Sequence, residues 1–440
     1  MKKTLLICPH YPLPETNGSN MRTMHFVRYF QQFGSVDIAY NNRQIDKDPR
    51  QDNLRDLNRI WPSQLSVRRA SSLVTGPNPD NGAVFRTKLQ LNLQDALDMK
   101  REFLLGALNR TPFPVFRYEK ASKDALMALI KDENYDYILV RYLYPAGLIE
   151  NFPEEIQRRV ILDIDDVLSG SLYDQLTNGA GGRLKKKLLA FNRRLLQSYE
   201  RKWCARVVSL VASESDRQKF IARGSRGSRA PIFVPNIYVP ASPMTASSDG
   251  FYNGNRLLFV GALDYSPNTE GLRWFLESIF PTFRETYPDA HLSVVGRNPT
   301  DEIRSLCDRT TGVELSPNVD DILGFYASSR VVVVPLLAGG GTRIKILEAA
   351  YASRPVLSTR IGAEGLDLSD GRDLSLFENA AQFVSAYTKL ADRKEYAAIA
   401  ESARNSCSAK YSSGALEGTM TSVLNAIDGE APRLVAEDSE

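Results

Sequence analysis

The chain has 440 residues, of which 43% are hydrophobic, 24% charged and 9% aromatic. Such a length suggests about two or three domains that can each bury a core, and the composition excludes a collagen, a disulfide-stabilised mini-protein and a wholly disordered chain. The formal net charge of +3 hides an asymmetry that predicts different partners for the two parts, because residues 1–250 hold 37 Lys and Arg against 26 Asp and Glu (+11), whereas residues 251–440 hold 18 against 26 (−8).

The four cysteines lie far apart and form no Cys-x-x-Cys pair. This pattern favours a reducing compartment, in which the thiols act as small apolar fillers. No stretch reaches the roughly 18 apolar residues that a membrane span needs, and the run Thr4–Cys8 is too short for a signal peptide. The sequence therefore predicts a cytoplasmic protein.

Short apolar runs alternate with longer helical patterns along the chain, which is typical of parallel strands covered by helices on both faces. The sequence predicts an α/β protein with two doubly wound, Rossmann-like parallel sheets, and with its active site in the cleft between the two domains, beyond the carboxyl ends of the strands. The predicted strands are Thr4–Cys8, Val36–Tyr40, Tyr137–Val140, Arg159–Leu162, Val207–Val211, Leu257–Val260, His291–Val295, Val331–Val334, Val356–Ser358 and Leu374–Phe377.

The alternation stops in a stretch rich in Pro, Ser and Gly and restarts at Arg256. Such a composition is typical of an interdomain linker. We expect an N-terminal domain over residues 1–236, a linker over 237–252, a C-terminal domain over 253–428 and a disordered acidic tail over 429–440.

A loop after the first strand ends in Asn17-Gly18-Ser19 and leads into a helix that carries Arg22. Backbone amides of Gly18 and Ser19 at a helix start, together with the charge of Arg22, can bind a phosphate. An ordinary turn followed by a helix cap would have the same residues, so both interpretations stay open here. His25 on this helix is expected to be a packed or surface histidine rather than a base.

Charged side chains follow two further predicted strands. Arg141 comes directly after Ile138-Leu139-Val140, and Asp163, Asp165 and Asp166 lie at the end of the next strand. Arg141 is therefore a candidate for the cleft, while a group of carboxylates at a strand end can hold a metal ion or cap a helix.

Residues 183–206 form a predicted basic amphipathic helix, because nine Lys and Arg face a single acid, Glu200. Such a helix can lie on anionic lipid, or it can dock its apolar stripe on the sheet of its own domain while the charges are solvated. The two interpretations are compatible, since the stripe can be core while the basic face meets headgroups. The stripe is expected to contain Leu184, Leu188, Phe191, Leu195, Tyr199 and Trp203.

The strongest local signal is a buried strand, Val331–Val334, that runs into a triple-glycine turn and a new helix. Glycine amides and a helix N-terminus favour an anion, and Arg343 and Lys345 add full charges where a diphosphate would lie. Glu348, farther along the helix, can accept hydrogen bonds from sugar or ribose hydroxyls. The alternative is a tight turn with solvated charges, but glycines combined with Arg and Lys in one turn favour phosphate binding.

This segment resembles the donor-binding element of retaining glycosyltransferase family 4, whose fold is GT-B. Landmarks of that family recur on both sides of it, and the variants that resemble it most are bacterial exopolysaccharide-associated sugar transferases. The landmarks are Phe259-Val260-Gly261, the Asp-Tyr-x-Pro-Asn stretch Asp264 to Asn268, Val294-Val295-Gly296-Arg297, Gly-Gly-Gly-Thr-Arg-x-Lys at 339–345, and Pro355-Val356 followed by a turn at Gly362.

The sequence departs from the family pattern at three positions. Gly340 stands in place of the first Glu of Glu-x7-Glu, so that only Glu348 remains, and Ala262 and Glu270 replace the usual phosphate-binding Arg and Lys. Because some cation must stabilise the departing diphosphate, Arg343 and Lys345, helped by Arg297, are interpreted as replacements.

The resemblance implies that residues 1–236 form the acceptor-side domain and residues 253–428 the nucleotide-sugar-binding domain. It also implies a set of site residues but neither a cofactor nor a metal. The expected catalytic residues are Arg343, Lys345, Glu348, Asp165 and Asp166, the two aspartates because no histidine stands where the family has one near the reacting sugar. The expected donor-binding residues are Gly18, Ser19, Arg22, Gly261, Arg297, Gly339, Gly340, Gly341 and Thr342, and the expected acceptor-side residues are Arg141 and Asp163.

The resulting hypothesis is an enzyme that transfers a sugar from a nucleotide diphosphate to an acceptor hydroxyl with retention of configuration, on a surface glycan or lipid-linked saccharide. Helix 183–206 would hold it peripherally on the inner face of the plasma membrane. Two alternatives stay open: a nucleotide-sugar epimerase or hydrolase of the same fold, and a non-catalytic binding subunit. Nucleic acid is not an expected partner, because no helix-turn-helix, zinc or aromatic-stacking signature accompanies the basic stretch.

Overall fold

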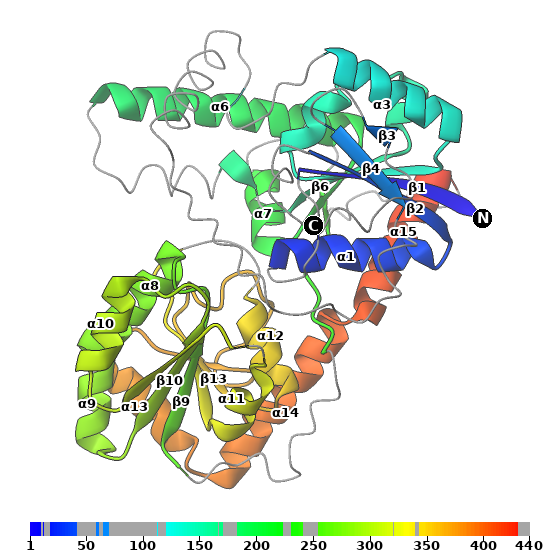
Figure 1. The fold of residues 1–440 in the computed structure, drawn as a ribbon. Coiled ribbons are helices and arrows are strands. Elements are labelled where there is room, and N and C mark those ends of the chain that lie inside the picture. The colour runs from blue at the N-terminus through cyan, green and yellow to red at the C-terminus, as the bar shows by residue number, and fades with distance from the viewer. Residues whose placement is uncertain are drawn as a thin grey trace. The chain divides into compact units, whose positions relative to one another are not determined.

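The computed structural model divides the chain into two compact units, Met1–Val234 with Glu417–Glu440, and Pro235–Leu416 (Figure 1). Each unit contains one twisted sheet with helices on its faces. The structure describes residues 1–9, 12, 18–41, 59–60, 65–69, 112, 120–165, 167–169, 183–222, 230–240, 254–319, 321–338 and 343–429.

The sheet of the first unit has the strand order β3-β4-β2-β1-β5-β6-β7-β8. All neighbours pair in parallel except β4, which is antiparallel to β2 and β3. The five strands predicted in this half are confirmed, whereas β3, β4 and β8 were not predicted. The strands are β1 (Lys2–Cys8), β2 (Gly34–Asn41), β3 (Arg59–Ile60), β4 (Leu65–Arg69), β5 (Tyr137–Arg141), β6 (Val160–Asp165), β7 (Val208–Val211) and β8 (Ile232–Phe233).

One hydrophobic core of the first unit joins the parallel strands to α3 (Lys120–Glu133), α6 (Arg183–Arg206) and α7 (Glu214–Ala222). Its members include alternate residues of the strands, for example Ile138 and Val140 of β5. Alternation arises because successive strand side chains point to opposite faces of a sheet. The remaining helices of the unit are α1 (Gly18–Gln31), the 3-10 helix η4 (Tyr144–Leu148), α4 (Glu154–Gln157) and most of α15 (Ser413–Asp428).

Helix α6 has the predicted bounds, but its buried stripe differs from the predicted one. Tyr199 and Trp203 are buried as expected, and with Leu196 they enter the core. Phe191, however, is 42% exposed, and Leu189 is buried instead. The difference arises because the helix turns about 100° per residue, so that the face chosen by the sheet follows Leu189, Leu196, Tyr199 and Trp203 and leaves Phe191 outside.

The sheet of the second unit is all parallel, with the order β11-β10-β9-β12-β13-β14. Its central strands are buried on both faces, since Leu257 and Phe259 of β9 contribute to one core and Leu258 to another. The five strands predicted in this half are confirmed, and β11 was not predicted. The strands are β9 (Arg256–Val260), β10 (His291–Gly296), β11 (Val313–Pro317), β12 (Val331–Val334), β13 (Val356–Ser358) and β14 (Ser375–Leu376).

Two layers of helices supply these two cores. An aromatic cluster that includes Phe275, Phe283 and Phe383 fills the layer beside α8, α9, α10 and α13, with rings packed edge to face. Tyr326 of α11 and Ile346 of α12 enter the other layer. The helices are α8 (Ser266–Trp274), the π-helix η5 (Phe275–Ile279), α9 (Phe280–Thr286), α10 (Asp301–Arg309), α11 (Leu323–Ser328), α12 (Ile344–Tyr351), α13 (Ala380–Lys389) and α14 (Arg393–Lys410).

The chain returns to the first unit within α15, so that the division of the chain differs from the predicted single C-terminal domain over 253–428. Polar contacts hold the helix there: the hydroxyls of Tyr29 and Thr421 lie 3.3 Å apart, and the hydroxyl of Tyr137 donates to Asp428 at 2.7 Å. These partners are about 290 to 390 residues apart in sequence, which no local pattern reveals. The predicted linker lies largely outside the described residues, as does nearly all of the acidic tail.

All four cysteines are free and buried, in agreement with the role of apolar fillers. Among the helices that the structure describes, none is both long and apolar enough to cross a membrane.

We expect Trp203→Ala to lower the free energy of unfolding of the first unit by about 3–5 kcal/mol, because truncation of a fully buried indole leaves a cavity in the core. Phe191→Ala on the same helix is the matched control and should change it by about 0.5 kcal/mol or less, as is usual for a surface position. Urea unfolding followed by hydrogen exchange in peptides from β5 to β7 measures both. Equal effects of the two substitutions would contradict the observed docking face of α6.

Candidate functional site

Polar side chains gather at the carboxyl edge of each sheet, at the point where the strand order reverses. In the first unit this point lies between β1 and β5, and in the second between β9 and β12. Doubly wound sheets bind their ligands at such switch points, because the connections leave in opposite directions there. The two groups of side chains differ in how their charges are compensated.

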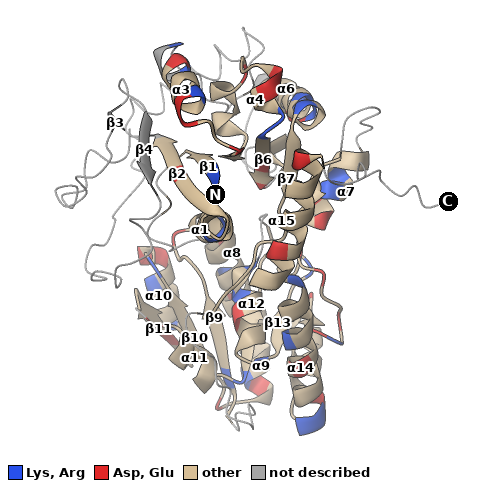
Figure 2. Ribbon diagram, turned by 90° about the vertical axis from the view of Figure 1, so that its right-hand side faces the viewer, with Lys and Arg blue, Asp and Glu red and all other residues tan. Residues whose placement is uncertain are grey.

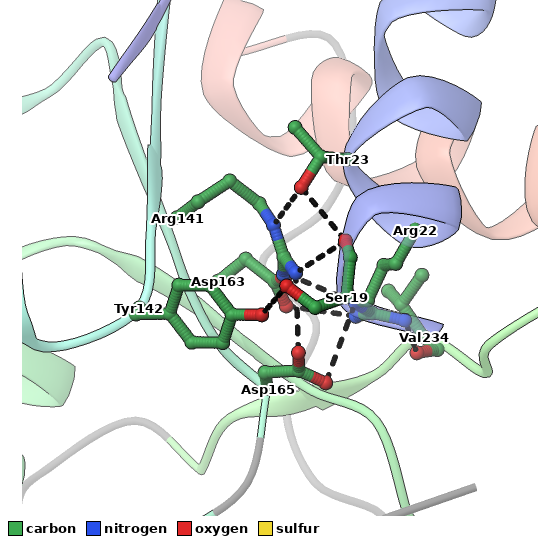
Figure 3. Close-up of polar contacts among 8 residues, drawn as sticks. All are labelled: Ser19, Arg22, Thr23, Arg141, Tyr142, Asp163, Asp165 and Val234. Atoms are coloured by element: carbon green, nitrogen blue, oxygen red, sulfur yellow. Dashed lines mark hydrogen bonds and ion pairs between the residues drawn. The ribbon is translucent and has the colours of Figure 1, made fainter. Parts of the chain in front are cut away.

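In the first unit, Arg22 of α1 forms a buried two-bond ion pair with Asp163 of β6 (Figure 3). Its Nε and Nη2 donate to the two carboxylate oxygens at 2.9 and 2.7 Å, and its Nη1 donates to the backbone oxygen of Val234 at 2.8 Å. Side-chain exposure is 2% for Arg22 and 0% for Asp163. The planar guanidinium matches the carboxylate geometry, which is the reason that arginine is favoured in buried pairs of this kind.

Arg141, at the end of β5, completes the network and is itself fully buried. Its guanidinium forms an ion pair with Asp163, donates from Nη2 to Asp165 at 3.1 Å and donates from Nε to the hydroxyl of Thr23 at 3.0 Å. Two arginines therefore face two aspartates inside the unit (Figure 3). The network joins α1 to the ends of β5 and β6.

Asp165 and Tyr142 both have positive φ angles, of 64° and 68°. Non-glycine residues rarely adopt this region, and they do so where the surroundings hold them, often at functional sites. The hydroxyl of Tyr142 donates to that of Ser19, the second residue of α1. Burial alone would raise the pKa of the Asp165 carboxyl, but the charges of Arg141 and Arg22 lower it below its usual value.

The network changes the interpretation of several predicted site residues. Arg22 was expected to bind the donor, and Arg141 and Asp163 to face the acceptor, but all three side chains are buried and bonded to one another, so we assign them a structural role. Ser19 keeps a position at the helix start, as predicted, together with Gly18. Asp166 lies outside the described residues.

Two other predictions for this region concern a metal site at the aspartates and the role of His25. Asp163 and Asp165 face arginines, and within the described part of the chain no three His, Cys, Asp or Glu side chains gather in a way that could hold a metal ion. His25 is buried on α1, as expected of a packed histidine, and burial together with the charges of Arg28 and Arg22 lowers its pKa to about 4.

In the second unit, Lys345 lies in the first turn of α12 and reaches the end of β9. Its Nζ donates to the side-chain oxygen of Asn268 at 3.0 Å and lies 5.1 Å from the centre of the Phe259 ring. Gly261 follows β9 directly, and a Cβ at that position would come within 2.8 Å of the Asn268 amide and 3.1 Å of Nζ. Two separate sequence landmarks, Asp264 to Asn268 and the segment that ends in Lys345, therefore meet at one point.

The Lys345 ammonium is electrostatically unsatisfied. Its pKa is lowered to about 7, chiefly by burial and also by the nearby charge of Arg343, while the charge of Glu348 opposes the shift. Arg343 directly precedes α12, is 6% exposed and donates from Nη2 to the backbone oxygen of Ile361 at 3.3 Å. An anion that bound beside these two cations would restore the charged form of Lys345.

Glu348 lies one turn farther along α12, where the hydroxyl of Tyr326 donates to its Oε2 at 2.7 Å. Burial raises the pKa of Glu348, although the Tyr326 hydrogen bond and the charge of Lys345 act against that rise. Tyr326 is fully buried in α11. The sequence did not reveal that Tyr326 donates to Glu348, since no local pattern indicates a hydrogen bond between residues 22 positions apart.

The loops that follow β9 and β10 are joined at the same edge, because the amide of Leu263 donates to the backbone oxygen of Arg297 at 2.8 Å. The side chain of Arg297 is exposed there. The structure thus brings Gly261, Arg297, Arg343 and Lys345 to one edge of the second sheet. Four other predicted donor-binding residues lie outside the described residues: Gly339, Gly340, Gly341 and Thr342.

Comparison with known proteins agrees with this geometry. Residues 254–393 match the family model of the group 1 glycosyl transferases. An uncharacterized 44.6 kDa protein in the cps region of Klebsiella pneumoniae is 24% identical over 275 residues, which cover 60% of this chain and 67% of that protein.

Solved structures share the two-sheet fold. The sucrose-phosphate synthase of Thermosynechococcus elongatus superposes with a TM-score of 0.63 at 15% identity, over 98% of this chain and all of that one. Anabaena HepE, solved in complex with UDP-glucose, superposes with a TM-score of 0.56 at 13% identity, over 96% of this chain and 99% of that one. At these identities the likeness establishes the fold.

Removal of one member of the buried network should destabilise the first unit. We expect Asp163→Ala to lower its free energy of unfolding by about 3–5 kcal/mol, because two buried guanidinium groups lose their partner. The control is Glu154→Ala, which removes an exposed ion pair with Arg158 and should cost less than about 1 kcal/mol. Chemical unfolding with hydrogen exchange in β5 and β6 measures both, and a small effect of Asp163→Ala would show that the network is not structural.

Proposed function

We propose that the chain is a group 1 glycosyltransferase of family 4, and that it transfers a sugar from a nucleotide-diphosphate donor to an acceptor hydroxyl with retention of configuration. The observation that carries the proposal is the Lys345 ammonium, held at the end of β9 by Asn268 beside Arg343. This cationic pair lies inside the region that matches the family model. The diphosphate of the donor would bind against it.

Electrostatics explain how these groups would accelerate the reaction. Negative charge grows on the departing diphosphate while the anomeric carbon becomes positive. Cations fixed in position before the reaction stabilise that charge more in the transition state than in the ground state. Lys345 is partly uncharged without ligand, since its pKa is about 7, so the approach of a diphosphate would draw a proton onto it.

Glu348 would bind a donor hydroxyl. Tyr326 occupies its Oε2, which leaves Oε1 as an acceptor for a sugar or ribose hydroxyl group. The backbone amides of Gly339 to Gly341, with Thr342, and the side chain of Arg297 remain predicted donor contacts. The leaving phosphate itself would accept the proton of the acceptor hydroxyl, so that no protein base is required, and neither a metal nor a cofactor is part of the proposal.

Uridine nucleotides are the first donors to test, because the HepE structure holds UDP-glucose. The relative from the cps region supports an acceptor in surface polysaccharide synthesis, either a growing glycan or a lipid-linked saccharide. The first unit would supply the acceptor side through Asp165, whose positive φ angle fits a functional role, and Gly18 and Ser19 remain predicted donor contacts.

The basic helix α6 supports peripheral binding to an anionic membrane. Its outer stripe at positions 187, 191, 194, 198 and 201 is exposed throughout and contains Lys187, Arg194 and Arg201 around Phe191. Figure 2 shows Lys and Arg positions along α6 in blue. Basic residues near an anionic surface contribute about 1 kcal/mol each, and an apolar ring among them can enter the headgroup layer. We place the protein on the inner face of the plasma membrane on this basis.

The double substitution Arg343→Ala with Lys345→Ala should reduce turnover by about a hundredfold or more, because the departing diphosphate loses both cations. Lys394→Ala, at an exposed position on α14, is the control and should retain full activity. Sugar transfer from UDP-glucose and other nucleotide sugars to a lipid-linked acceptor measures this, with circular dichroism as the check on folding.

Near-normal turnover in the folded double variant would contradict the assignment. Conversion of the donor without any acceptor would instead identify an epimerase or hydrolase. Nucleotide binding without turnover across all donors would identify a binding subunit.

Replacement of Lys187, Arg194 and Arg201 by Ala should weaken binding to vesicles that contain phosphatidylglycerol by about a hundredfold, and binding should also fall with added salt. The matched control replaces three lysines of α3, at positions 120, 123 and 131, and so removes the same charge from another helix of the same unit. Vesicle flotation measures both. Equal losses in the two variants would mean that α6 is not the binding surface.

A further inference from the structure

Asn268 is the immediate partner of the proposed catalytic cation, Lys345. It lies in the first turn of α8 and is only 7% exposed. Its side-chain oxygen accepts from Lys345 Nζ at 3.0 Å, and its side-chain nitrogen donates to the backbone oxygen of Ala262 at 3.0 Å. An ammonium can only donate and a carbonyl oxygen can only accept, so these two partners determine the orientation of the amide.

We propose that Asn268 is a positioning residue for the transferase reaction: it orients Lys345 Nζ at the end of β9, where the diphosphate of the donor is stabilised, and it favours the charged form of the lysine. This inference rests on the proposed function, because it assumes that Lys345 meets the diphosphate. Asn268 does not itself touch the substrate.

The surroundings of Lys345 show why such a partner is needed. Burial disfavours its charged form, and Arg343 from the segment before α12 repels it. Glu348 on the same helix attracts the charged form of Lys345, while the Tyr326 hydroxyl of α11 donates a hydrogen bond to one of the two carboxylate oxygens of Glu348. The ring of Phe259 in β9 lies 5.1 Å from Nζ and adds a weak cation–π attraction. Among the described contacts of Nζ, the oxygen of Asn268 is the direct hydrogen-bond acceptor.

A neutral amide suits this task better than a carboxylate would. Aspartate at 268 would neutralise the ammonium and so reduce the positive potential that stabilises the diphosphate. Its second oxygen would also face the Ala262 carbonyl oxygen, which cannot donate a hydrogen bond. The amide accepts from the ammonium without cancelling its charge. Gly261 makes room for this arrangement, because a Cβ there would clash with the Asn268 amide.

The test substitutes Asn268 in two opposite ways and follows the titration of Lys345 directly. Asn268→Asp should move the half-titration of Lys345 to higher pH, since a negative charge favours the ammonium, whereas Asn268→Leu should move it to lower pH, since the acceptor is lost. NMR of lysine side chains in the full-length protein, with the signal assigned through Lys345→Arg, reports this without any substrate. Asn255→Leu, which disturbs a hydrogen bond to Asp289 elsewhere in the second unit, is the control and should leave the titration unchanged.

The pH dependence of turnover should shift in the same two directions as the titration of Lys345. The alkaline limb of the kcat/KM profile should move up in pH for Asn268→Asp and down for Asn268→Leu, with kcat reduced about ten- to a hundredfold in both, as expected for the loss of a charge-assisted contact. A purely structural asparagine would lower stability and activity without opposite shifts of Lys345, and that result would overturn the proposal. Full activity of Lys345→Ala would instead overturn the proposed function, so the two failures are distinguishable.

Discussion

The buried ion pair between Arg22 and Asp163 is the interaction on which the first unit depends. It ties the first helix to the end of β6, and Arg141 extends it to the end of β5, so that the elements around the switch point share one set of bonds. Two positive charges oppose two negative ones, which makes burial of all four tolerable. The arrangement explains how Asp165 and Tyr142 can keep positive φ angles beside the start of α1.

In the second unit, by contrast, the charged form of a buried lysine is disfavoured. Burial and the nearby charge of Arg343 lower the pKa of Lys345 to about 7, although the charge of Glu348 opposes that shift. Residues 251–440 carry a formal charge of −8, which repels a diphosphate over long range. The site must therefore attract its ligand through a few local cations. A lysine whose charged form is disfavoured without the ligand is stabilised strongly in that form when an anion binds beside it.

Most strands and the overall fold could be predicted, because buried parallel strands appear as continuous apolar runs whatever surrounds them. The resemblance to glycosyltransferase family 4 is confirmed over residues 254–393, which match the family model of the group 1 glycosyl transferases. The buried stripe of α6 contains the predicted Tyr199 and Trp203, but Leu189 is buried in place of Phe191, since apolar residues lie at several angles around that helix and only the sheet selects among them. The short strands β3, β8 and β11 lack a pattern of their own, and the same is true of the contacts that return α15 to the first unit.

For the site, the sequence by itself determined the chemistry that is available: a glycine-rich turn with Arg343 and Lys345 after a buried strand, and charged residues at the ends of β5 and β6. Only the tertiary structure decided which of those charges are already satisfied. Arg22, Arg141 and Asp163 have the same residue types as a binding site, yet they bond to one another, whereas Lys345 has a neutral partner in Asn268. The physical reason is that the energy of a charge depends on its burial and its nearest partners, and those partners come from elements far apart in sequence.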